Sequence, residues 1–199
     1  MSYAVLAALL LLPPDALVNK VIDVYGGAAA WSKVTEIVAH GRVVPAMRKG
    51  DGTMTRTWRG LDNLRVEIAY PENKSEVRVL ENGKGTNNGR DSNAMELDAM
   101  RLQAARLALP KLLAQNKGAV RTTGANTMEL TLDGLTLDIE VDPATGHIVR
   151  STGHSGQLAF ETAYSDFRSV NGLLIPFHEE NSAMGMKTAD IFLDKVEVK

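Results

Sequence analysis

The longest helical pattern of hydrophobic and polar positions in the chain covers residues 93–116, NAMELDAMRLQAARLALPKLLAQN. Asn93, with Glu96 three positions later, forms a capping-box pattern that marks the start of a helix. At about 100° per residue, the apolar side chains fall into two patches on nearly opposite sides of this helix. The first patch contains Leu97, Met100, Ala104, Leu107 and Ala108, and the second contains Met95, Leu102, Ala105 and Leu109.

The two patches predict that this helix is buried on two sides, because a helix at the protein surface needs only one apolar stripe. Pro110 lacks a backbone N–H and clashes inside a helix, so it either kinks the helix or starts a second short one at residues 111–115. Two interpretations of the patches stay open. Both faces could pack against protein, or one could line a ligand cavity, and periodicity does not separate these cases.

Shorter helices are expected near the start of the chain. The first covers residues 15–25, with Asp15 as its cap. Gly26 and Gly27 end it, as glycine commonly does after the last helical turn. Residues 28–34 favour one or two further helical turns, in which Trp31 is the apolar anchor.

On both sides of the long helix the pattern changes to a period of two, which is typical of half-buried strands. Leu64, Val66 and Ile68, for example, alternate with polar or small residues, and Asn-Gly or Asp-Gly pairs between segments are strong hairpin signals. Before the helix, the expected strands are residues 35–44, 53–59, 64–70, 76–81 and 84–88. After it, we expect about six more strands among residues 119–123, 127–132, 135–141, 147–152, 158–164, a segment near Phe167, residues 173–177 and residues 187–198.

Turn signals recur roughly every ten residues, which is typical of an antiparallel meander. Strands and helices do not alternate, so a doubly wound parallel sheet is excluded. About eleven strands in one sheet curl strongly under their natural twist, and a curled sheet has a concave face. We therefore expect an α+β fold in which a curved antiparallel sheet of about eleven strands wraps around the long helix, with short N-terminal helices.

The composition narrows the possible functions. A chain of 199 residues favours one domain, here residues 16–199 after an N-terminal segment of residues 1–15. Lys and Arg number 22 and Asp and Glu 24, so a net charge of −2 gives no electrostatic case for nucleic acid or an anionic membrane. Cysteine is absent, which excludes disulfides, thiolate metal sites, a cysteine nucleophile and lipidation on an N-terminal cysteine.

The apolar run at residues 4–12, AVLAALLLL, precedes Pro13 and Pro14. It is too short to span a bilayer, which needs roughly 18 to 20 residues. Its length fits the apolar region of a secretory signal, although only Met1, Ser2 and Tyr3 stand where a positively charged region is usual. We expect export to the periplasm; the alternative is an apolar N-terminal helix packed on the domain.

No recognised catalytic or metal-binding motif occurs in the sequence. Zinc-site spacing is absent among the histidines, which are His40, His147, His154 and His178. His178 and Glu179 are neighbours in an expected strand, so they point to opposite faces. Residues 83–86, GKGT, lack the earlier glycine of a phosphate loop, and residues 151–156 lack the GxSxG elbow of hydrolases. We expect neither enzyme activity nor a metal ion or cofactor.

Three features together resemble bacterial outer-membrane lipoprotein-sorting proteins of the LolA/LolB-like group. They are GGAAAWSKVTEIVAHGRVV at residues 26–44, the meander with its central helix, and YSDFRSVNGLLIPFHEE at residues 164–180. The resemblance covers most of residues 16–199. Its most recognisable part, residues 164–176, is a signature of the fold and not of catalysis.

The resemblance implies an incomplete barrel, closed by helices, whose apolar cavity holds acyl chains. LolA-like members are soluble periplasmic carriers, whereas LolB-like members carry a lipidated N-terminal cysteine. The absence of cysteine departs from the LolB pattern. Arg42 and Arg65 match the lid arginine of LolA-like carriers in residue type only, so its role is transferred to neither.

Two functions from different classes follow. The first is a carrier whose partner is a lipid or the acyl chains of a lipoprotein, and an open volume between sheet and helix would favour it. The second is a module that docks on another envelope protein, and a filled interior would favour that. The expected ligand-binding residues, for each of which plain core packing is the alternative, are Trp58, Leu64, Val66, Ile68, Val77, Val79, Leu97, Met100, Leu107, Leu137, Ile139, Leu158 and Phe160.

Overall fold

The computed structural model describes residues 15–199, so the apolar run at residues 4–12 lies outside the described residues. The strands form two runs along the chain. The first run comprises β1 (Ile37–Pro45), β2 (Gly52–Gly60), β3 (Asn63–Ala69), β4 (Ser75–Glu81), β5 (Lys84–Asn87) and β6 (Arg90–Asp91). The second run comprises β7 (Val120–Thr122), β8 (Thr127–Leu132), β9 (Leu135–Val141), β10 (Ile148–Ser155), β11 (Leu158–Val170), β12 (Leu173–Ala183) and β13 (Met186–Val198).

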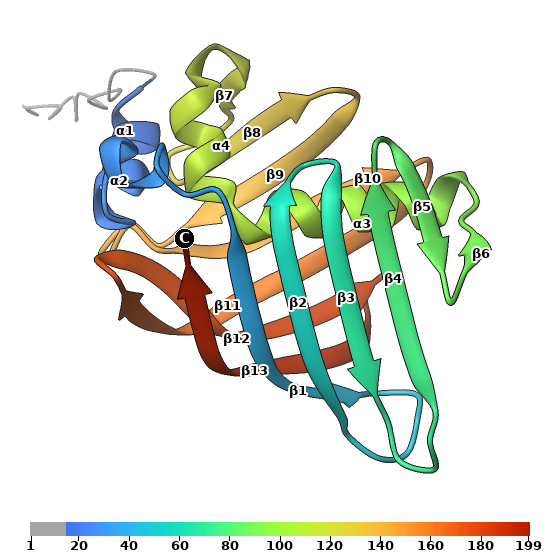
Figure 1. The fold of residues 1–199 in the computed structure, drawn as a ribbon. Coiled ribbons are helices and arrows are strands. Elements are labelled where there is room, and N and C mark those ends of the chain that lie inside the picture. The colour runs from blue at the N-terminus through green and yellow to red at the C-terminus, as the bar shows by residue number, and fades with distance from the viewer. Residues whose placement is uncertain (1–14) are drawn as a thin grey trace, which may run out of the picture.

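The two runs are joined into one 13-stranded sheet in the order β6-β5-β4-β3-β2-β1-β13-β12-β11-β10-β9-β8-β7. The junction is antiparallel pairing of the first strand with the last, from Ile37 opposite Val198 to Pro45 opposite Ala189. β6 and β7 form the two edges, and the sheet bends into a half-barrel that stays unclosed (Figure 1). The curved antiparallel sheet expected from the sequence is confirmed.

The sheet differs from the expected one in its details. β6 is a strand of 2 residues, too short to show a period of two in the sequence. β11 runs unbroken from Leu158 to Val170 past Asp166, which has a φ of 52°, and its pairing with β12 keeps the same register on both sides of that residue. β10 continues to Ser155, through residues that the sequence pattern assigned to a turn.

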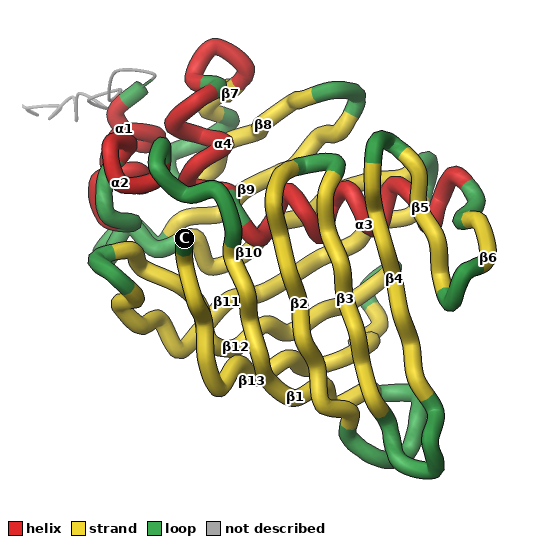
Figure 2. Tube along the Cα trace, in the orientation of Figure 1, coloured by secondary structure: helices red, strands yellow, loops and turns green. Residues whose placement is uncertain are grey.

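The long helix α3 (Ala94–Leu107) lies in the concavity, against β2 to β5 on one side and β9 and β10 on the other (Figure 1). Helix α4 (Leu109–Gln115) follows it and packs on α1 (Ala16–Val24) and α2 (Ala28–Trp31), and η1 (Lys117–Ala119) leads into β7. Figure 2 shows these short helices gathered at one end of the half-barrel. Within the described residues, none of the helices combines the length and apolarity that crossing a membrane would need.

The helix boundaries test the local sequence signals. The capping box is present, because Glu96 N donates to Asn93 Oδ1 at 3.0 Å and Asn93 N donates to Glu96 Oε2 at 2.9 Å. Pro110 occupies the first turn of α4, where its missing N–H costs nothing, so it starts a second helix. Asp15 precedes α1, but its side chain makes no capping hydrogen bond because its backbone is already helical.

Candidate ligand-binding interior

The space between the concave face and the helices is divided into two compartments. The inner compartment lies beneath the short helices, and about 40 Å³ of it is open to a water-sized sphere. Its walls are mainly apolar and include Trp31, Ile37, Leu109, Ile148, Ile175 and Val196. Apolar side chains from both runs of strands thus meet here, far apart in the chain.

The walls of the inner compartment are fixed by polar contacts at their edges. The Trp31 indole N–H donates to the carbonyl of Tyr25 at 2.9 Å, and Ile148 N donates to the Tyr25 hydroxyl at 3.0 Å. These bonds satisfy the polar atoms of two aromatic side chains whose rings face the cavity. Burial raises the pKa of Tyr25 well above its usual value, so this hydroxyl stays neutral.

The outer compartment is the mouth of the half-barrel, and it is wider, with about 320 Å³ open to a water-sized sphere. Its lining mixes apolar residues such as Met54 and Ile68 with the charged Glu76 and Arg78. Arg78 of β4 donates a hydrogen bond to Gln103 of α3 at 3.3 Å, which links the strand to the helix at the mouth. The mouth is therefore polar where the inner compartment is apolar.

A buried ion pair stands where the compartments meet. Arg56 of β2 donates to both carboxylate oxygens of Glu179 on β12, at 2.9 and 2.6 Å. Arg56 is 2% exposed and Glu179 8%, and both line the two compartments. Two parallel hydrogen bonds are the geometry in which arginine binds a carboxylate most strongly.

Arg106, near the end of α3, completes this boundary and also borders both compartments. It donates Nε–H to Ser151 Oγ at 3.2 Å and a terminal N–H to the carbonyl of Phe160 at 2.5 Å. Ser151 Oγ in turn lies 2.7 Å from the Tyr164 hydroxyl. Burial lowers the pKa of Arg106 and raises the pKa of Tyr164 to about 12.

This polar cluster was not predicted from the sequence, although part of its signal is visible there. Met54, Arg56 and Trp58 alternate with threonines, so Arg56 shares the inward face with two apolar residues. An arginine in that position requires an anionic partner, because an unpaired buried charge is very costly. Which carboxylate supplies it is settled only by the pairing of strands that are distant in the chain.

The expected ligand-binding residues divide into groups. Ile68, Leu107 and Phe160 border the mouth, and Leu107 also borders the inner compartment. Leu97 packs on the core and is partly buried, and Leu158 is half-buried at the start of β11. The others that face inward belong to the close-packed core and border neither compartment: Trp58, Leu64, Val66, Met100, Leu137 and Ile139.

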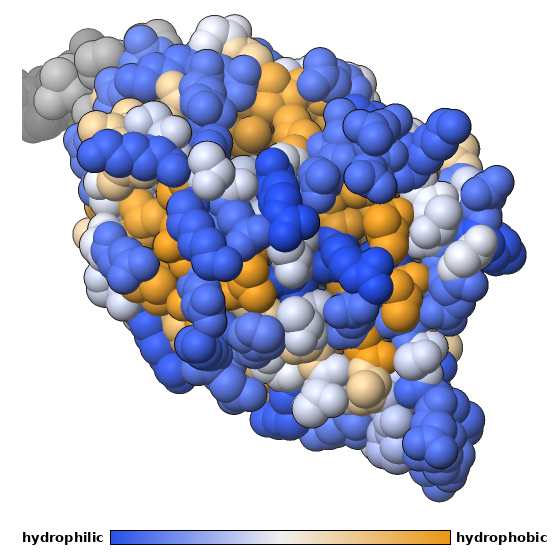
Figure 3. All heavy atoms as spheres, viewed as in Figure 1, coloured by the Kyte–Doolittle hydropathy of each residue, from blue (hydrophilic) through white to orange (hydrophobic). Residues whose placement is uncertain are grey.

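Val77 and Val79 instead lie on the outer face of β4. Register decides this, because Val66 pairs with Arg78 and Leu64 with Leu80, and directly opposed residues share a face. Leu80 is accordingly buried, and Val77 borders a groove on the outer surface. On the outer face seen in Figure 3, hydrophobic residues lie in separate patches within a mainly hydrophilic surface.

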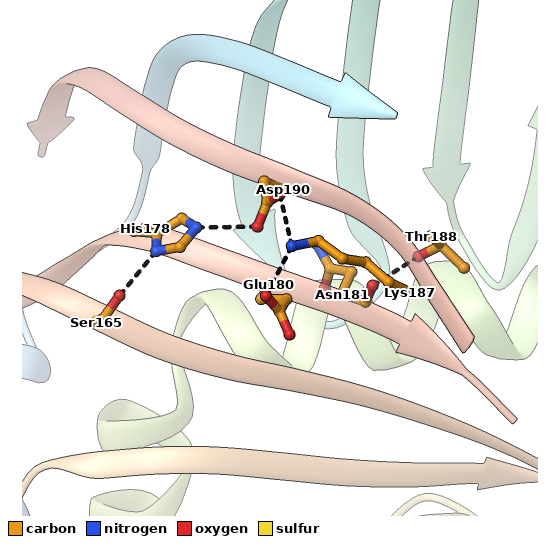
Figure 4. Close-up of polar contacts among 7 residues, drawn as sticks. All are labelled: Ser165, His178, Glu180, Asn181, Lys187, Thr188 and Asp190. Atoms are coloured by element: carbon orange, nitrogen blue, oxygen red, sulfur yellow. Dashed lines mark hydrogen bonds and ion pairs between the residues drawn. The ribbon is translucent and has the colours of Figure 1, made fainter. Parts of the chain in front are cut away.

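A second polar cluster covers the outer face of β11 to β13 (Figure 4). Ser165 Oγ lies 2.8 Å from His178 Nδ1, and His178 Nε2 lies 3.1 Å from Asp190 Oδ1. Lys187 bridges Glu180 and Asp190 at 2.7 and 2.8 Å. His178 faces outward and Glu179 inward, so their expected divergence is confirmed.

The row of Ser165, His178 and Asp190 has the residue types of a hydrolase triad but not its surroundings. Acyl transfer needs N–H donors aimed at the developing oxyanion, and β12 pairs on both sides, with β11 and β13. Its backbone N–H groups are therefore committed to the sheet. Among residues 15–199, no group of three histidine or carboxylate side chains is arranged to hold a metal ion.

Comparison with known proteins gives a likeness in fold. No profile of a known protein family and no curated protein matches the chain. A LolA superfamily protein from Nitrosomonas europaea superposes with a TM-score of 0.58 at 10% identity, over 94% of each chain. A DUF1329 family protein from Desulfovibrio piger superposes with a TM-score of 0.49 at 10% identity, over 94% of this chain and 93% of that one. LprF from Mycobacterium bovis superposes with a TM-score of 0.33 at 12% identity, over 92% of this chain and 94% of that one.

Proposed function

We propose that this chain, whose fold is that of a LolA superfamily protein, is a periplasmic binding or carrier protein for a hydrophobic ligand. The ligand class is a lipid or the acyl chains of a lipoprotein. The observation that carries this proposal is the apolar inner compartment, which adjoins an open mouth along Leu107 and the Arg56–Glu179 pair. Burying hydrocarbon contributes about 0.8 kcal/mol per CH₂, so a single chain in such a site binds usefully.

The inner compartment is narrow, so ligand entry requires the short helices to move. About 40 Å³ is open to a water-sized sphere, whereas pockets for lipid-sized ligands hold roughly 300 to 1,000 Å³. The polar contacts of α1 include exposed hydrogen bonds from Lys20 Nζ to the Pro143 carbonyl at 2.7 Å and from Lys117 Nζ to Asn19 at 2.6 Å, which contribute little in water. The helix also buries Leu17, Val18, Val21 and Ile22, so the hydrocarbon that the ligand buries must offset the exposure of these side chains.

A second candidate function is a non-enzymatic module that binds another cell-envelope protein. The same narrowness of the inner compartment favours it, because an interior filled by its own side chains needs no ligand. Under this alternative the half-barrel is a scaffold, and recognition lies on its surface.

Leu107→Glu tests the carrier proposal. Leu107 borders both compartments and is only partly buried. A carboxylate there places a negative charge beside the ligand without placing one inside the close-packed core. We expect at least a tenfold loss of binding of a fluorescent fatty-acid probe. Native mass spectrometry and organic extraction of protein from a bacterial periplasm should show a lipid or lipopeptide with the wild type and not with the variant.

The matched control is Met95→Glu, which adds the same charge to the same helix at a side chain that is 43% exposed. It should leave probe binding unchanged. A wild-type protein that carries no lipid and binds no probe would exclude the carrier and leave the docking module. Unchanged binding in a folded Leu107→Glu variant would place the ligand elsewhere.

A further inference from the structure

The boundary between the compartments carries an excess of positive charge. Arg56 and Glu179 neutralise each other, and in the mouth Arg78 pairs with Glu76 at 3.0 Å. Arg106 contacts only the neutral Ser151 and the Phe160 carbonyl, and within residues 15–199 it forms no ion pair.

The third carboxylate of the lining does not supply the missing charge. Glu161 borders the mouth, but its ion pair is with Arg150 at 3.5 Å, a residue that borders neither compartment. The guanidinium of Arg106 is thus a partly buried cation whose charge is compensated by carboxylates only at a distance. Such a group binds an anion well, because pairing relieves a cost that the protein has already incurred.

Hydrogen-bond donors are also left over at this boundary. Ser151 and Tyr164 have two hydroxyl hydrogens between them, and the bond that joins them uses one. Ser151 Oγ otherwise accepts from Arg106, so one hydroxyl hydrogen has no acceptor among the described residues. Arg56 Nε is likewise buried there without a partner. Surplus donors beside a surplus positive charge match an oxyanion.

We propose that the ligand is a single-chain anionic amphiphile whose carboxylate or phosphate binds the Arg106 guanidinium and the Tyr164 hydroxyl, while Ser151, which is buried behind them and borders neither compartment, orients both. Its hydrocarbon chain then lies in the apolar inner compartment, with the head group at the boundary facing the polar mouth. This inference rests on the proposed carrier function and specifies its ligand class. The narrowness of the inner compartment favours one chain over two.

The alternatives fit these observations less well. A neutral head group would leave the Arg106 charge unpaired, and a cationic one would be repelled by it. A free phosphate ion would use the donors but none of the apolar wall. An anionic amphiphile uses both, and it brings the net charge of Arg56, Glu179, Arg106 and ligand to zero.

The test is isothermal titration calorimetry with five ligands, with the charged amphiphiles below their critical micelle concentrations and the neutral ones below their solubility limits. Dodecanoate and dodecyl phosphate carry the two candidate head groups, methyl dodecanoate and dodecanol are the neutral counterparts, and inorganic phosphate is the head group alone. The wild type should bind both anionic amphiphiles at least tenfold more tightly than the neutral ones. The tighter of the two anions identifies the head group, and inorganic phosphate should bind far more weakly than either.

Arg106→Gln should abolish the preference for the charged ligands, and Tyr164→Phe should reduce it several-fold. Arg101→Gln is the matched control on the same helix, because Arg101 contacts the Asp133 carbonyl and borders neither compartment. It should leave the preference intact. If Arg106→Gln does not fold, Tyr164→Phe and the wild-type comparison still decide.

Four results would overturn the inference. Equal binding of charged and neutral amphiphiles by the wild type would remove the head-group site and leave the carrier function standing. A preference that persists in a folded Arg106→Gln variant would place the head group elsewhere. Inorganic phosphate binding as tightly as dodecyl phosphate would indicate a site for free anions. Binding of no ligand at all would exclude the proposed carrier function as well.

Discussion

At the scale of single residues, the decisive feature is a charge pair placed where apolar packing is expected. Arg56 and Glu179 are separated by 123 positions in the chain and lie on the inward faces of strands from different runs. Both charges have lost their hydration, so each depends on the other. The pair contributes little to net stability, but removing one partner alone destabilises the protein strongly.

We expect Glu179→Gln to lower the free energy of unfolding by about 3 kcal/mol, because it leaves the Arg56 charge buried and unpaired. Replacing both partners, with Arg56→Met and Glu179→Leu, should recover most of this loss. Urea denaturation of the single and double variants measures the difference.

The control is the outer-face pair of Arg65 and Glu67, which stays about half exposed. Arg65→Gln should change the unfolding free energy by less than about 1 kcal/mol. If Glu179→Gln costs no more than this surface substitution, the Arg56–Glu179 pair is hydrated in solution.

At the scale of elements, the position of α3 depends on one close approach to the sheet. A Cβ added at Gly153 of β10 would lie 2.3 Å from the Leu102 side chain. Leu102 is fully buried, so it has no space into which to withdraw. A glycine in a strand is otherwise unfavourable, and here it lets the helix pack directly on the backbone.

Gly153→Ala should therefore destabilise the protein by about 1 to 3 kcal/mol through overpacking against Leu102. Thermal and urea denaturation give the value. Gly118→Ala is the control, since nothing lies within 4 Å of an added Cβ there. A neutral Gly153→Ala would mean that α3 shifts freely over β10.

At the scale of the whole molecule, the half-barrel is held at its surface by many charged hydrogen bonds whose strength depends on pH. Five surface carboxyl groups accept hydrogen bonds that lower their pKa values. The pairs are Glu36 with Lys199, Glu96 with the Asn93 N–H, Asp142 with the Thr145 N–H, Asp166 with Arg168, and Glu197 with Lys195. In the opposite direction, burial raises the pKa values of Tyr25 and Tyr164.

These shifts predict a plateau of stability near neutral pH. A carboxyl group whose pKa is lowered by folding stabilises the protein above its unfolded pKa, near 4, and loses this effect as pH falls further. A tyrosine whose pKa is raised by folding stabilises below its unfolded pKa, near 10, and loses this effect above it. The urea midpoint should therefore fall below about pH 4 and above about pH 10. A midpoint that is constant from pH 7 to pH 3 would contradict the carboxylate part.

Local residue patterns specified most of the helices and strands and the geometry at their ends. The capping box of Asn93 and Glu96, the helix start at Pro110 and the alternation of Met54, Arg56 and Trp58 all operate within a few residues, so the chain encodes them locally. The number of strands and their turn spacing then fixed the curved antiparallel sheet. The resemblance in residues 26–44 and 164–180 pointed to the same fold.

The contents of the interior follow from contacts between segments that are distant in the sequence. Both faces of β4 carry apolar residues, and pairing with β3, not hydrophobicity, put Leu80 inside and Val77 and Val79 outside. Arg56 pairs with Glu179 because strands that are far apart in the chain pack together. The volume beneath the short helices has the same origin. The burial of a side chain and the partner of a buried charge both depend on neighbours that are distant in the sequence. A local pattern of residues therefore does not predict them.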